Sequence, residues 1–135
     1  MDKALNYMAL ARKAGRIELG EEPVGAAART GHAKLVVVAS DASDHTWRRA
    51  KSYVAGTAQQ CIRLPYSKDD MGMAIGRTSL AIAAFSDAAL ALAFLKALPN
   101  QETEALAALT EQTCRVQQRQ KEAKAHQKNV RKGKK

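Results

Sequence analysis

Apolar residues along the first hundred positions follow two alternating spacings, one typical of helices and one of strands. Helical spacing predicts helices at about 3–14, 23–30, 43–56, 67–75 and 87–98. Short apolar or alternating segments between them predict strands at 16–19, 34–39, 61–64 and 80–85. The order predicts the α/β class, a three-layer α/β/α sandwich around a central, mixed sheet of four strands. The continuous β-branched run at 34–39 is typical of a strand covered on both faces, so we expect it inside the sheet.

Residues that favour helix starts precede several of the predicted helices. A side-chain oxygen is available to cap the first turn at Ser43, Ser67 and Asp87. Pro23 suits the first turn of its helix, and the residue before a proline favours extended backbone. We therefore expect Glu22 to be an extended cap and the helix to begin at Pro23.

The apolar pattern ends in two steps after residue 98. Pro99 and Asn100 interrupt it, and a last helix is expected over 99–116. From 117 to 135 almost nothing remains to be buried, so this segment is expected to fray into disorder unless a partner orders it. We therefore divide the chain into an α/β domain at 1–98, a C-terminal helix at 99–116 and a basic tail at 117–135.

The formal charge of +9 is concentrated at the C-terminal end of the chain. Residues 1–114 hold 13 basic and 12 acidic side chains, whereas 115–135 hold nine basic side chains and only Glu122 as an acid. We expect these nine to contact phosphates: Arg115, Arg119, Lys121, Lys124, Lys128, Arg131, Lys132, Lys134 and Lys135. A nearly neutral body with a cationic extension is typical of a protein that binds a polyanion. Nucleic acid is the first candidate partner and an anionic membrane surface the second.

Other features argue against membrane, secreted and metal-binding classes. The longest apolar stretches, at 80–85 and 88–95, are far shorter than the roughly 20 residues that span a bilayer. The N-terminus lacks the features of a secretory signal, so we expect a cytoplasmic protein. Cys61 and Cys114 lie far apart in the sequence and are expected to be free thiols without a functional role. No metal site is expected, because ligand spacing is missing around the histidines at 32, 45 and 126.

Five short motifs occur in an order and spacing that are specific when taken together. They read LARKAGR (10–16), LGEE (19–22), GHAKLVVVASDAS (31–43), SKDDMG (67–72) and AIGR (74–77). With them, the segment from Ala9 to about Phe94 resembles the ribosomal-protein superfamily of the L-seven-Ae and L-thirty-e type. It looks closest to the bacterial YlxQ-like branch. The resemblance implies an α/β/α sandwich that binds RNA, usually a kink-turn, along one edge.

The resemblance also places the RNA contacts in two segments of this chain. One is the glycine turn and helix start at 20–26, and the other is the loop at 76–79 that enters the last strand. The expected RNA-binding residues are Arg16, Gly20, Glu21, Glu22, Arg29, Gly76, Arg77, Thr78 and Ser79. A helix start offers backbone amides to phosphates, and a loop can present side chains to unstacked nucleotides.

Several positions depart from the pattern of the kink-turn readers. Counting from Gly20, the family's asparagine, glutamate and lysine fall on Glu22, Pro23 and Ala26, and its apolar loop is Arg77, Thr78 and Ser79 here. Two hypotheses therefore stay open. In the first, a monomer binds ribosomal RNA or another structured RNA, with the ribosome as a further candidate partner. In the second, a domain that has lost kink-turn recognition uses its tail to contact a protein or an anionic surface.

Catalysis is not expected, because no nucleophile, base and orienting group form a set in this sequence. Asp69 and Asp70 are adjacent and so diverge on a helix. We expect no cofactor, since the glycines at 72 and 76 do not follow a strand as a dinucleotide fingerprint would. Arg48, Arg49 and Lys51 have two readings, a solvated helix face or a basic surface.

Overall fold

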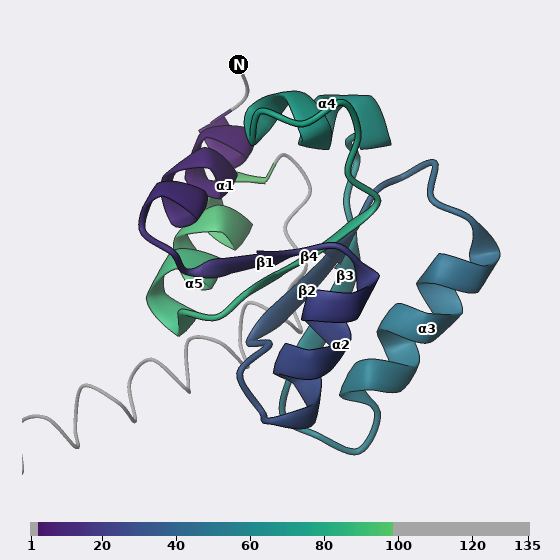
Figure 1. The fold of residues 1–135 in the computed structure, drawn as a ribbon. Helices are drawn as coiled ribbons and strands as arrows, with labels where there is room; N and C mark the ends of the chain where they lie inside the picture. Colours follow the sequence, from purple (N-terminus) through teal and green to yellow (C-terminus); the bar gives the residue numbers. More distant parts are fainter. Residues whose placement is uncertain (1–2, 99–135) are drawn as a thin grey trace, which may run out of the picture.

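The computed structural model describes residues 3–98, in which five helices alternate with four strands (Figure 1). The helices are α1 (Lys3–Lys13), α2 (Glu21–Arg29), α3 (Asp44–Val54), α4 (Lys68–Ala74) and α5 (Ala88–Ala97). The strands are β1 (Ile17–Leu19), β2 (Leu35–Val38), β3 (Gln60–Arg63) and β4 (Ile82–Phe85). Each boundary lies within two residues of the expected one. The helix expected at 99–116 and the tail at 117–135 lie outside the described residues.

The four strands form one mixed sheet in the order β1-β4-β2-β3. β4 pairs antiparallel with both β1 and β2, whereas β2 and β3 run parallel. β2 lies inside the sheet, and all four of its residues are buried. The predictions of a mixed sheet and of an interior β-branched strand are confirmed.

Alternation along the strands divides the buried side chains between the two faces of the sheet. Figure 1 shows α1 and α5 on one side of the sheet and α2 and α3 on the other. Leu35, Val37, Ala83 and Phe85 pack with α1, α4 and α5. Val36, Val38, Ile82 and Ala84 pack with α2 and α3. The rings of Phe85 and Phe94 lie 4.9 Å apart, which joins β4 to α5. The three-layer sandwich is confirmed.

Local capping residues explain where three of the helices begin. The side chains of Ser43, Ser67 and Asp87 accept hydrogen bonds from first-turn amides of α3, α4 and α5, as predicted. These interactions satisfy amides that have no acceptor within their own helix. The start of α2 differs, because no side chain caps it.

The expected start of α2 was wrong by two residues. Glu22 is helical, and Gly20 precedes the helix in place of an extended Glu22. Pro23 is therefore the third residue of α2, where its missing N–H removes no hydrogen bond from the helix. The preference of a residue before proline for extended backbone is thus overridden within the first turn.

Among residues 3–98, no helix has the length and apolar character needed to cross a membrane.

Candidate nucleic-acid interface

The pairing of β1 with β4 brings the two expected RNA-binding segments to one end of the sheet. Because these strands are antiparallel, the end of β1 lies beside the start of β4, with Leu19 opposite Ala83. The Gly20 amide donates to the Ile82 carbonyl at 3.0 Å. The chain after Gly20 enters α2, and the chain before Ile82 comes from the loop at 76–79 (Figure 1).

Gly20 adopts a backbone conformation that other residues rarely reach. Its φ of 99° and ψ of 161° lie in a region that is essentially restricted to glycine. No side chain caps α2, so the amides of Glu21 and Glu22 are left without an acceptor from their helix or from a cap. The start of α2 is consequently a site where backbone donors are available to a ligand.

The two glutamates at this start have different surroundings. The Glu21 carboxylate lies 3.6 Å from the Arg49 guanidinium, so an ion pair holds it toward α3. Glu22 is exposed, and no ion pair involves it among residues 3–98. Both carboxylates favour the positive end of the helix dipole, but only Glu22 is free to meet a ligand.

The loop at 76–79 is held against α4 by its backbone. The Arg77 amide donates to the Gly72 carbonyl at 2.8 Å, and the Leu80 amide donates to the Lys68 carbonyl at 2.9 Å. A Cβ at Gly72 would lie 2.6 Å from the Ser79 Cα, so the close approach requires glycine at 72. All four loop residues are exposed. The side chains of Arg77, Thr78 and Ser79 therefore face solvent on a backbone that is fixed at both ends.

Two further cations, which the sequence reasoning did not select, lie close to this loop. Arg12 and Lys13 end α1 and line a hollow of about 300 Å³ with Ala74 and Ile75. A Cβ placed on Gly76 would lie 3.3 Å from the Arg12 Nη1 atom. Both cations belong to the LARKAGR motif, so the resemblance pointed to their segment without pointing to their side chains.

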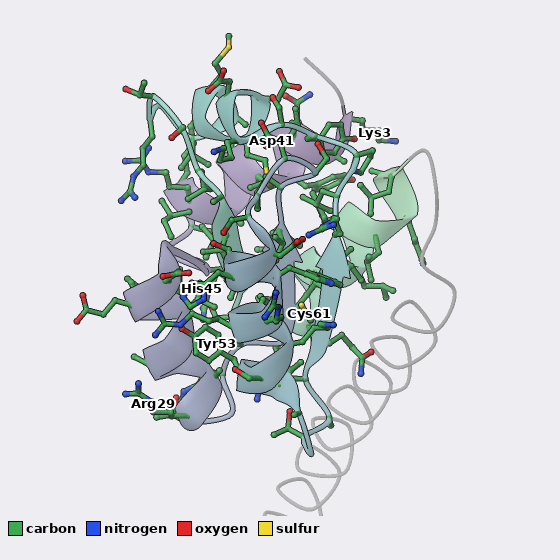
Figure 2. The ribbon with its side chains drawn as sticks, turned by 90° about the vertical axis from the view of Figure 1, so that its right-hand side faces the viewer. Lys3, Arg29, Asp41, His45, Tyr53 and Cys61 are labelled. Atoms are coloured by element: carbon green, nitrogen blue, oxygen red, sulfur yellow. The ribbon has the colours of Figure 1, made fainter. Side chains whose placement is uncertain are left out.

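A groove of about 480 Å³ extends from the start of α2 along its contact with α3. Its lining comprises Glu21, Glu22, Gly25, Ala26, Arg29, Arg49 and Tyr53. Figure 2 shows Tyr53 between the two helices and Arg29 at the far end of α2. Arg29 thus shares a groove with Glu22, although the helix rise places them about 10 Å apart. The sequence allows two readings of Arg49, and its ion pair with Glu21 makes it part of this groove.

Arg16 does not join the other expected residues. It precedes β1, and its carbonyl accepts from the Ser86 amide at 2.9 Å, at the opposite end of the strand from Gly20. At about 3.3 Å per residue, the two positions are about 13 Å apart. The nine expected cations at 115–135 lie outside the described residues. Within residues 3–98, no group of three His, Cys, Asp or Glu side chains is arranged to hold a metal ion.

Comparison with known proteins identified a similar sequence and similar solved structures. No family model matches the chain. The chain is 36% identical over 75 residues to the RNA-binding protein YlxQ of Enterococcus faecium, a match that covers 56% of this chain and 72% of that protein. A protein of unknown function from Bacillus halodurans aligns with a TM-score of 0.63 at 23% identity, over 82% of this chain and 99% of its own. A 15.5 kD RNA-binding protein of Giardia lamblia aligns with a TM-score of 0.60 at 18% identity, over 78% of this chain and 85% of its own. At these identities the two structural matches establish the fold alone.

Proposed function

Because this chain belongs to the YlxQ family, we propose that it binds a structured RNA at the end of the sheet where α2 begins. The relative from Enterococcus faecium is itself named for RNA binding. The observation that carries the proposal is an uncapped helix start beside an exposed, backbone-anchored loop. Ribosomal RNA is the first candidate ligand, with the ribosome or its assembly as the setting.

The described residues divide between positioning the RNA and reading it. The amides of Glu21 and Glu22 can donate to a phosphate, because the positive end of the α2 dipole also favours an anion there. Arg77 in the loop at 76–79, with Arg12 close to that loop, adds positive charge for further phosphates. The Glu22 carboxylate accepts from the N1 and N2 donors of a guanine, and Thr78 with Ser79 faces unstacked nucleotides. Base contacts of this kind would determine preference, while the phosphate contacts hold the RNA in place.

Kink-turn recognition is the finer form of the proposal, and it can be tested by restoring the family's residues. The triple variant Glu22→Asn, Pro23→Glu and Ala26→Lys supplies all three. Pro23 lies in the first turn of α2 and Ala26 is exposed, so neither change disturbs the packing. We expect a gain of about tenfold or more in affinity for a kink-turn RNA, since a good base contact contributes about 1–3 kcal/mol. An equal gain for a scrambled hairpin would mean that the added lysine acts only as a charge.

The tail is proposed to supply much of the affinity without supplying the preference. Residues 117–135 hold eight of the 22 Lys and Arg residues. Each phosphate that they neutralise contributes about 0.7 to the slope of log affinity against log salt for single strands. Deleting 117–135 should therefore flatten the slope by several units for every RNA, while the order of preference among RNAs is kept. An unchanged slope would show that the tail does not engage the RNA.

Truncation should leave the melting temperature nearly unchanged, because residues 3–98 by themselves contain a sheet of four strands with helices on both of its faces. A large fall in the melting temperature would instead give the tail a structural role.

Crosslinking in cells, followed by sequencing of the attached RNA, tests the function itself. Recovery of ribosomal RNA at one or two positions is the expected result. The matched control is the variant Gly20→Val with Arg77→Ala, which changes both proposed reading segments and should lose those positions. Background recovery from the wild type would favour the second hypothesis, a domain that contacts a protein or an anionic surface. That hypothesis is favoured by Glu22, Pro23 and Ala26, which occupy the positions of the asparagine, glutamate and lysine of the kink-turn readers.

A further inference from the structure

A second basic surface lies between α3 and the edge strand β3, on the side of α3 away from α2. Trp47 and Lys51 stand four residues apart on α3 and so share one face of the helix. Cys61 and Arg63 pair in register with Val36 and Val38, which pack toward α2 and α3. Strand alternation therefore directs both side chains toward α3. Figure 2 shows Cys61 on the β3 side of α3 and Tyr53 on its α2 side.

Two cations from distant parts of the chain meet at the Trp47 ring. The Arg63 guanidinium carbon lies 4.9 Å from the ring centroid, and the Lys51 Nζ atom lies 5.4 Å from it. The ring is half-buried, whereas both cations are exposed. The negative face of an indole ring attracts a cation, so the two side chains are held near each other despite their like charge.

Within the part of the chain that the structure describes, no carboxylate forms an ion pair with Lys51 or Arg63. Burial raises the pKa of the Cys61 thiol to about 12, and the nearby Lys51 charge opposes that rise only in part. The thiol consequently stays protonated at neutral pH and offers no negative charge.

The remaining cations of α3 are divided between its two sides. Arg49 pairs with Glu21 on the α2 side. Arg48 is exposed and precedes Lys51 by three residues, so it extends the surface that contains Trp47. A helix face that merely contacts solvent would explain the exposed cations of α3. It does not explain Arg63, which lies on a strand and whose guanidinium is held over the same Trp47 ring.

We propose that the surface formed by Trp47, Lys51 and Arg63, with Arg48 beside it, binds the sugar-phosphate backbone of an RNA segment outside the part contacted at the start of α2. A guanidinium held over a ring keeps its N–H donors in a fixed plane, which suits the oxygens of a phosphate. The surface itself favours a polyanion, since Arg48, Lys51 and Arg63 are all exposed. The proposal rests on the RNA binding proposed above and adds a second contact region to it.

Salt titrations of the full-length protein test this surface with two RNAs. One probe is a kink-turn RNA with short arms, and the other is the same RNA with one arm lengthened by a helical turn. The test variant is Lys51→Gln with Arg63→Gln. The control is Lys3→Gln with Lys96→Gln, which removes the same charge from α1 and α5 on the other side of the sheet.

We expect the test variant to bind the long RNA less tightly, with a salt slope lower by about 1.4 to 1.8, as for two lost phosphate contacts. The short RNA should show no such change, and the control pair should alter neither slope comparably. Arg63→Lys, which keeps the charge, should retain most of the slope. Equal effects of the test and control pairs on the long RNA would overturn the proposal. Failure of the wild type to bind either RNA would instead remove the RNA-binding function on which it rests.

Trp47 offers an independent measurement, because it is the only tryptophan in the chain. In the wild type, iodide should quench Trp47 emission more strongly than in the Lys51→Gln, Arg63→Gln variant, since the two cations attract the anion. The long RNA should protect Trp47 from iodide, and the short RNA should not. If the long RNA binds and iodide quenching stays the same, the RNA does not cover this surface and the proposal is overturned.

Discussion

Three helices begin at the same end of the sheet, but they begin in two different ways. α3 and α4 each start behind a serine, whose side chain accepts from the Thr46 amide at 3.2 Å or from the Asp70 amide at 3.1 Å. α2 starts behind Gly20, which has no side chain to offer. At a capped start a first-turn amide already donates to the capping side chain, whereas at an uncapped start the amides remain available to a ligand or to water. The starts of α3 and α4 therefore contribute to the stability of the fold, whereas the start of α2 leaves its amides accessible to a ligand.

The largest expected effect concerns the loop that lies beside the open start of α2. Gly72→Ala would place a Cβ within 3.0 Å of three backbone atoms of Arg77 and Ser79. We expect destabilisation of about 1–3 kcal/mol from this overpacking, together with weaker RNA binding because the loop must shift. Denaturant unfolding and RNA titration would measure the two effects.

Gly25→Ala is the matched control, since it also adds one methyl group to a buried helical glycine. The three atoms nearest to its new Cβ all belong to the Tyr53 side chain, at 3.3 to 3.5 Å, and a side chain can move where backbone cannot. A variant at 72 as stable as the one at 25 would show that the loop is not fixed to α4.

The next effect concerns the glycine that opens α2. Gly20→Ala forces a Cβ into a conformation essentially restricted to glycine, which costs about 1–3 kcal/mol of stability. RNA affinity should fall as well, because the chain must rotate and carry the amides of Glu21 and Glu22 with it.

Gly31→Ala separates backbone strain from ligand binding. Gly31 follows the other end of α2 and also has a positive φ, of 78°, but a Cβ added there would meet nothing within 4 Å. This variant should lose stability and keep its RNA affinity. If both variants lose affinity equally, the site at the start of α2 has no special role.

A smaller effect is expected at the capped starts. Ser43→Ala and Ser67→Ala each remove the hydrogen bond to a first-turn amide, and each should cost about 1 kcal/mol of stability. RNA affinity, measured below the unfolding transition, should stay the same. A loss of affinity in Ser67→Ala alone would extend the interface to the start of α4.

The smallest effect distinguishes the two glutamates. Glu21→Gln weakens an ion pair that is about half exposed on the Arg49 side, so stability should change by less than about 1 kcal/mol. Glu22→Gln should leave stability unchanged and alter the order of preference among RNAs with different guanines. Identical binding profiles for the two variants would contradict the assignment of Glu22 as the reading residue.

Local signals were enough to predict the elements of this fold, and the reason is physical. Helical periodicity, serine caps and a run of valines act over a few residues, so every boundary was found to within two positions. Glu22 was misassigned because the preference of a residue before proline for extended backbone is a local one, and here the helix overrides it. The outcome depends on where the helix begins, and α2 begins directly after Gly20.

The candidate site was less predictable, because it depends on pairing between distant segments. The juxtaposition of Gly20 with the loop at 76–79 follows from the antiparallel register of β1 and β4. Only the resemblance indicated that these two segments lie along one edge. Arg16 was expected among the RNA-binding residues with Gly20, although an extended strand separates the two. The convergence of Arg63 on Trp47 could not be anticipated, since it requires the register of β3 beside β2.

The position of Arg63 on the outermost strand bears on how accessible this edge of the sheet is to strand pairing. β1 and β3 are the two edges of the sheet, and they are only three and four residues long. Free edges invite strands of other molecules, and short length, charge and proline are common safeguards. β3 ends in Arg63, with Pro65 two residues later. A phosphate bound at Arg63 would mask one of these safeguards, so the bound RNA itself would have to shield the edge.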